Sequence, residues 1–99
     1  MNLSEFKASI QKGQIPDDLT VYLHSLWLDG KGDWDKAHSL IDHLEDTDAA
    51  FLHAYLHRKE GDLGNASYWY RRAGKTKPNI GLAEEWEQMV LYFLEKMKK

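Results

Sequence analysis

The sequence of 99 residues contains no cysteine, which excludes disulfide bonds, thiol catalysis and thiolate metal ligands. It lacks the basic excess of a nucleic-acid binder, since its formal net charge is −3. No apolar run approaches the roughly 20 residues that a membrane-spanning helix needs, and residues 1–13 show no apolar segment of a secretory signal. We therefore expect a cytoplasmic protein, in keeping with the lack of cysteine, that binds neither nucleic acid nor membrane.

The alternating apolar and polar pattern of β-strands is also missing, whereas apolar residues recur at helical spacing throughout. Hydrophobic residues make up 42% of the chain, which is enough apolar surface for a folded core. Glycines and acidic capping residues divide the sequence into about six helices. The fold class predicted is all-α, as one domain over residues 1–99, with an N-terminal helix over 3–12 that begins at an Asn2–Glu5 capping box.

A shift of 29 residues superposes one helical hairpin on the next, which indicates an internal repeat. Gly32-Asp33 then matches Gly61-Asp62, where glycine allows a tight turn and aspartate caps the following helix. We expect hairpins at about 16–45 and 47–74, with the first helix starting at Pro16, and a capping helix over 80–98. The remaining matches are Leu23-His24 with Leu52-His53, and Ala37 with Ala66.

Two segments, residues 32–37 (GDWDKA) and 61–66 (GDLGNA), resemble the Gly-Asp-Tyr-x-x-Ala turn of tetratricopeptide repeats. Residues 68–73 (YWYRRA) are also similar to the related Sel-one-like repeats. The resemblance implies antiparallel helices in a short right-handed superhelical array, and a non-catalytic module that binds a protein or peptide. A repeat of 29 residues is shorter than the usual length of about 34, which suggests a compact, bacterial-type member.

The histidines carry a second hypothesis. His53 and His57 are four residues apart and project from one helical face, which Glu60 continues, and His24 holds the position of His53 in the first hairpin. Because packed helices lie about 8–10 Å apart, these four residues could form a zinc-type site. The alternative is that the histidines are packing residues, because this spacing is generic and no His-Glu-x-x-His motif occurs. No cofactor is therefore expected.

A further candidate surface is basic and consists of residues 57–59 (HRK) with Arg71, Arg72, Lys75 and Lys77. Its arginines could recognise an acidic peptide or a carboxylate, and one aromatic of the run 68–70 must point away from the core, most readily Tyr68. The alternative is a solvated, solubilising face. The full set of ligand- or partner-binding candidates is His24, His53, His57, Arg58, Glu60, Tyr68, Arg71 and Arg72.

No catalytic constellation is evident, because the serines lack a nucleophile-elbow context and phosphate-binding glycine loops are missing. The sequence thus favours a protein- or peptide-binding module without enzymatic activity. Two alternatives stay open. One is a small-molecule or metal-binding protein with a groove lined by histidine and arginine, and the other is a structural homodimer in which a second copy covers the ends of the short array.

Overall fold

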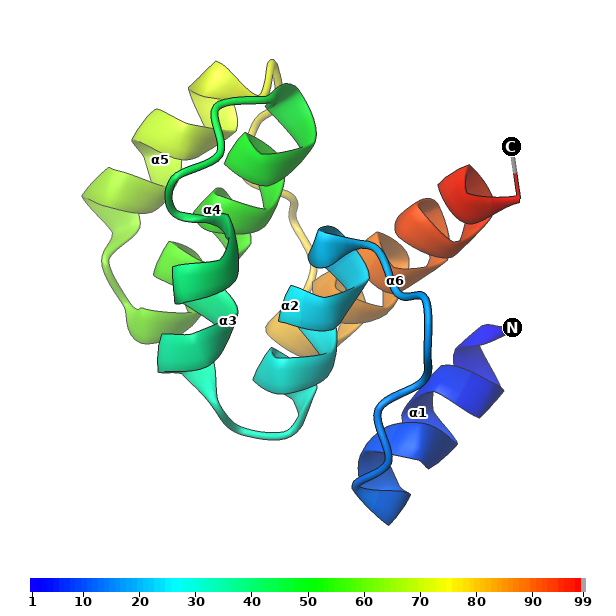
Figure 1. Cartoon of the computed structure of the whole chain (residues 1–99). Coiled ribbons are helices and arrows are strands. Elements are labelled where there is room, and N and C mark those ends of the chain that lie inside the picture. The colour runs from blue at the N-terminus through cyan, green and yellow to red at the C-terminus, as the bar shows by residue number, and fades with distance from the viewer. Residues whose placement is uncertain (99) are drawn as a thin grey trace.

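The computed structural model describes residues 1–98, which form six α-helices and no strand (Figure 1). The predicted all-α class and number of helices are confirmed. None of the helices in this part of the chain is long and apolar enough to cross a lipid bilayer. The helices are α1 (Leu3–Lys12), α2 (Val21–Gly30), α3 (Trp34–Ile41), α4 (Thr47–Glu60), α5 (Leu63–Arg72) and α6 (Leu82–Met97).

The N-terminal helix has the bounds predicted from its capping box. The Asn2 side chain accepts a hydrogen bond from the backbone N–H of Glu5 at 2.8 Å, and the Glu5 carboxylate accepts one from the Asn2 N–H at 2.9 Å. These two bonds satisfy donors that the first helical turn leaves free. At the other end, Gly13 has a positive φ of 69° and closes α1.

The two Gly-Asp turns have the predicted geometry. Gly32 and Gly61 have φ angles of 95° and 91°, a region that glycine enters without a steric penalty. The carboxylates of Asp33 and Asp62 then cap α3 and α5 by accepting a backbone N–H three residues ahead. Both turns therefore join two helices in the same way, 29 residues apart.

The predicted start of the first hairpin at Pro16 is wrong, because α2 begins at Val21. Asp18 has a positive φ of 62°, which is incompatible with a helix, and aspartate tolerates this conformation better than most residues. Thr20 is the N-cap instead, since its hydroxyl accepts from the Leu23 N–H. Residues 16–19 are therefore a connection and not a first helical turn.

Two further helix ends differ from the prediction. The first hairpin was expected to reach about residue 45, but α3 ends at Ile41 and the Leu44 N–H donates to the Ile41 carbonyl in a turn. The last helix is shorter than 80–98, since Gly81 precedes its first residue, Leu82. Helix α4 begins after Asp46, whose carboxylate caps it by accepting from the Ala49 N–H at 3.1 Å.

Most helices pack against their neighbours in the chain, whereas α6 contacts helices that precede α5. Helix α2 packs against α3, α4 packs against α5, and α3 also contacts α4, while α6 contacts α1, α2 and α4. Figure 1 shows α6 on one side of the hairpins with α1 next to it. Among the tryptophans, Trp27 is buried, whereas Trp34, Trp69 and Trp86 are half-buried at helix contacts.

Candidate functional site

Three histidine rings meet where α3 crosses α4. His53 and His57 stack on each other with ring centroids 4.9 Å apart, as their i, i+4 spacing predicted. His38 of α3 faces both rings, and its Nε2 lies 2.9 Å from Nε2 of His53. One nitrogen of each ring lies within 4.8 Å of the other two. This set of three side chains is called the histidine cluster below.

Two tryptophans form the walls of the histidine cluster. The indole of Trp34 stacks on His38 with centroids 4.9 Å apart, and the indole of Trp69 stacks on His53 at 4.0 Å. Trp34 is itself held in place because its Nε1–H donates to the Leu56 carbonyl at 2.7 Å. These contacts restrict the rings to one orientation, so the nitrogens of the cluster are positioned before any ligand arrives.

Carboxylates lie behind two of the three rings. The Glu60 carboxylate is 2.6 Å from Nδ1 of His57, a contact in which Nδ1 carries a proton and donates it to the carboxylate. Asp42 lies 3.9 Å from Nδ1 of His38. The Nδ2 amide of Asn65 is 3.4 Å from Nε2 of His57. The outer edge of the cluster is therefore polar, whereas its walls are aromatic.

Two rings of the cluster, His38 and His53, favour the neutral state. Burial, together with a smaller effect of the neighbouring rings of His38 and His57, lowers the pKa of His53 to about 4. Burial also lowers the pKa of His38, against a small opposing effect of Asp42. Neutral rings are the form in which histidine binds a metal ion or accepts a proton.

One polar atom of the cluster is left without a partner. Nδ1 of His53 is buried and forms no hydrogen bond within residues 1–98. A buried nitrogen of this kind lowers the stability of a fold, and such exceptions in otherwise well-satisfied interiors call for an explanation. The unpaired atom therefore marks the cluster as a place where packing alone does not account for the residues.

His24, which the repeat aligned with His53, is half-buried on α2 and belongs to neither group of metal-capable side chains found in residues 1–98. His24 and His53 lie on α2 and α4, the first helices of the two hairpins, and α3 contacts both of these helices. The ring that meets His53 comes from α3, so His38 takes the place proposed for His24. The only sequence signal for it is the i, i+4 pair Trp34 and His38, which shares one face of a helix.

Arg58, predicted to face a partner, points into the protein. Its guanidinium donates to the Glu85 carboxylate at 2.6 Å and to the Ile80 carbonyl at 2.5 Å, and only 13% of its side chain is exposed. The second Glu85 oxygen accepts from the Tyr70 hydroxyl at 2.6 Å. Arg58 therefore ties α4 to α6 and is unavailable to a partner in this conformation.

The other basic candidates do lie on the surface. Arg71 and Arg72 are exposed near the end of α5, where the Arg72 guanidinium lies 5.2 Å from the centroid of the Trp69 indole. Tyr68 is exposed, as predicted for one aromatic of its run, and contacts Trp69 edge-on. In residues 1–98, neither arginine takes part in an ion pair.

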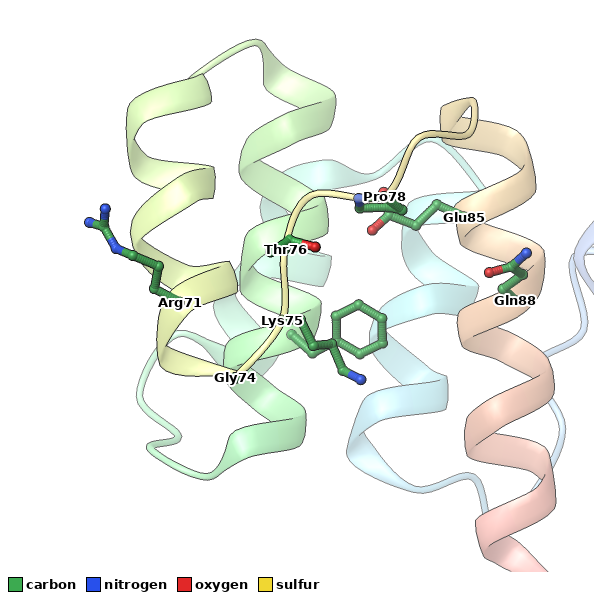
Figure 2. A pocket seen from close by; sticks show the side chains of 8 residues that line it. Arg71, Gly74, Lys75, Thr76, Pro78, Glu85 and Gln88 are labelled. Carbon is green, nitrogen blue, oxygen red and sulfur yellow. The ribbon is translucent and has the colours of Figure 1, made fainter.

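An open groove of about 730 Å³ lies between the α4–α5 hairpin and α6. Figure 2 shows the linker from Gly74 to Pro78 crossing between α5 and α6, with Arg71 on one side and Gln88 on the other. Phe51 contributes an apolar surface, and the Lys75 ammonium lies 4.8 Å from the centroid of its ring. This space is called the linker groove below.

No protein-family model, no curated protein and no solved structure matches this chain. The resemblance to tetratricopeptide repeats thus rests on the two turns and their spacing.

Proposed function

We propose that this chain is a non-catalytic interaction module of the tetratricopeptide-like type, and that it binds an acidic segment of a protein partner in the linker groove. The observation that carries the proposal is the combination, in one open groove, of an apolar surface from Phe51 and Pro78 with the exposed cation Lys75. A second exposed cation, Arg71, lies at the rim of the groove, where its guanidinium points away from the linker (Figure 2). Peptide-binding sites commonly join an apolar surface to a few polar groups that fix orientation.

The repeat supports this class of protein. Two hairpins with the same Gly-Asp turn stack through α3 and α4, and short helical arrays need additional helices to cover their ends. Helices α1 and α6 take that role in the proposal. The linker groove lies between the second hairpin and the covering helix α6.

The charge of the groove favours an acidic ligand. Glu85 is the acidic residue of its lining, but both carboxylate oxygens already accept hydrogen bonds, one from Arg58 and one from Tyr70. Arg71 and Lys75 have no carboxylate partner within residues 1–98. Arginine offers two parallel donors to a carboxylate, so a glutamate or aspartate of the partner would complete the site.

The test is affinity capture from the cytosol of the native host with three baits: the wild-type chain, the Arg71→Ala/Lys75→Ala variant, and a Lys36→Ala control. Lys36 is exposed on α3, away from the linker groove. We expect one partner that the wild type and the control retain and the double variant loses, with retention that weakens as salt screens the charges. Equal retention by all three baits would exclude the linker groove as the binding surface.

A further inference from the structure

We propose that His38, His53 and His57 bind a single Zn²⁺ ion, with a water molecule as the fourth ligand. This site is independent of the linker groove. Three histidine ligands and a water are a common coordination set for zinc in proteins, and imidazole is a ligand type that zinc prefers. The convergence of three rings from α3 and α4, with one nitrogen of each ring within 4.8 Å of the other two, points to a ligand.

The spacing of the nitrogens fits a metal ion of this size. Zinc–nitrogen bonds are about 2.0–2.1 Å long, so two ligand nitrogens of a tetrahedral site lie about 3.4 Å apart. The Nε2 atoms of His38 and His53 are 2.9 Å apart, and the three ligand nitrogens all lie within 4.8 Å of one another. A separation of His38 and His53 by about half an ångström and a small approach of His57 would produce the tetrahedral spacing.

The carboxylates provide the support that metal-binding histidines need. A ligand histidine usually donates its second ring N–H to a carboxylate, which fixes the ring and makes the other nitrogen a better donor. Glu60 does this for His57 at 2.6 Å, and Asp42 is near the equivalent atom of His38. The contact of Asn65 with Nε2 of His57 is long, at 3.4 Å, and a metal ion would replace it.

The rings also present the right protonation state and an entry path. Zinc binds neutral imidazole and must otherwise displace a proton, and burial keeps His38 and His53 neutral. His38 is partly accessible, with 23% of its side chain exposed. Solvent can therefore reach the open edge of the cluster, where the water ligand would sit.

A second group of donors competes for the same ion. His57, Glu60 and Asp62 also have ligand atoms within 4.8 Å of one another. The Asp62 carboxylate, however, caps α5 by accepting from the Asn65 N–H, and both acidic residues are exposed to water. We assign the ion to the three histidines because their rings are already fixed by Trp34 and Trp69.

The experiment is isothermal titration of the metal-free chain with Zn²⁺, followed by Co²⁺ as a coloured substitute, because zinc itself has no visible spectrum. His38→Phe removes one ligand while keeping a ring against Trp34, and Glu60→Gln alters the support without touching a ligand. The matched control is His43→Phe, since His43 is exposed and lies outside the cluster. Asp62→Asn keeps a capping side chain and tests the competing group. Circular dichroism establishes that each variant is folded.

We expect one ion per chain and a Co²⁺ complex with the strong visible absorption of four-coordinate geometry. Glu60→Gln should weaken zinc binding by about 10- to 100-fold, as for other supporting residues, and His38→Phe should weaken it further. His43→Phe and Asp62→Asn should bind as the wild type does. The proposal is overturned by a lack of stoichiometric binding, by unchanged affinity in His38→Phe, or by loss of binding in Asp62→Asn or His43→Phe.

Discussion

Arg58 of α4 and Glu85 of α6 form an ion pair inside the protein, with Nη1 2.6 Å from Oε1. Tyr70 and the Ile80 carbonyl complete the hydrogen bonds of the two charged groups. Removing one member of such a pair strands a buried charge, which is more damaging than losing the attraction itself. The pair therefore adds a buried polar connection between α4 and α6 to the apolar packing of α6.

We predict that Arg58→Met lowers the free energy of unfolding by about 3–5 kcal/mol, because Glu85 is left charged and buried. Urea denaturation followed by circular dichroism measures the change. Lys98→Met is the control, since Lys98 pairs with Glu95 on the surface at 3.9 Å and should contribute less than about 1 kcal/mol. A loss in Arg58→Met no larger than in this control would contradict the prediction.

The hydroxyl of Tyr70 gives a second prediction with a matched neighbour. Tyr70→Phe removes the 2.6 Å hydrogen bond to Glu85, and we expect a loss of about 1.5–3 kcal/mol, typical of a bond to a charged group. Tyr68→Phe, two residues away, removes the hydroxyl of an exposed side chain and should change stability by less than about 0.5 kcal/mol. Thermal or urea unfolding compares the two. Similar losses of stability in both variants would show that the hydrogen bond from Tyr70 to Glu85 makes no particular contribution to stability.

Gly30 is expected to tolerate no side chain. A Cβ atom at this position would lie 2.9 Å from both the Ile10 and the Trp86 side chains, where α1, α2 and α6 meet. We predict that Gly30→Ala destabilises the protein by about 1–3 kcal/mol through overpacking. Gly64 of α5 has open space around it, so Gly64→Ala should instead add about 0.5 kcal/mol of helix stability. The prediction would be wrong if denaturation experiments showed that both substitutions stabilise the protein, or that both destabilise it.

The histidine cluster predicts that the metal-free protein loses stability in acid. The pKa of His53 is about 4 in the folded chain and near 6.5 when unfolded. Between these values the unfolded state binds more protons, so stability rises with pH and falls as pH drops from about 6.5 to 4. The full difference corresponds to about 3 kcal/mol.

Urea denaturation at several pH values, with a chelator present, measures this dependence. His53→Gln should flatten it, whereas His43→Gln should leave it unchanged because His43 is exposed and outside the cluster. A wild-type protein that is as stable at pH 4.5 as at pH 7 would contradict the prediction.

The sequence was most informative where structure depends on neighbouring residues. The Asn2–Glu5 capping box and the two Gly-Asp turns are local, so their bonds could be predicted from spacing alone. The start of α2 was not predictable in this way. Asp17 and Asp18 look suited to a first helical turn, but the positive φ of Asp18 and the Thr20 cap place the helix later.

The candidate site was predictable only in part, for a reason of geometry. His53, His57 and Glu60 share one face of one helix, and the structure does bring these three together. His38 and Arg58 depend on how different helices pack, which the repeat pattern does not specify. An arginine in a run of basic residues resembles a surface residue until its partner, Glu85, is known to lie 27 positions away.

The contact between α1 and α6 also bears on the order in which the protein assembles. Phe6 and Trp86 lie with ring centroids 6.0 Å apart, and Lys7 pairs with Glu87, 80 positions away in the sequence. Each hairpin closes over a short stretch of chain, which is fast, whereas joining α1 to α6 must close nearly the whole polypeptide. We therefore expect the hairpins to form early and the α1–α6 junction last. Changes at Gly30 or Trp86 should then mainly accelerate unfolding and leave the folding rate almost untouched.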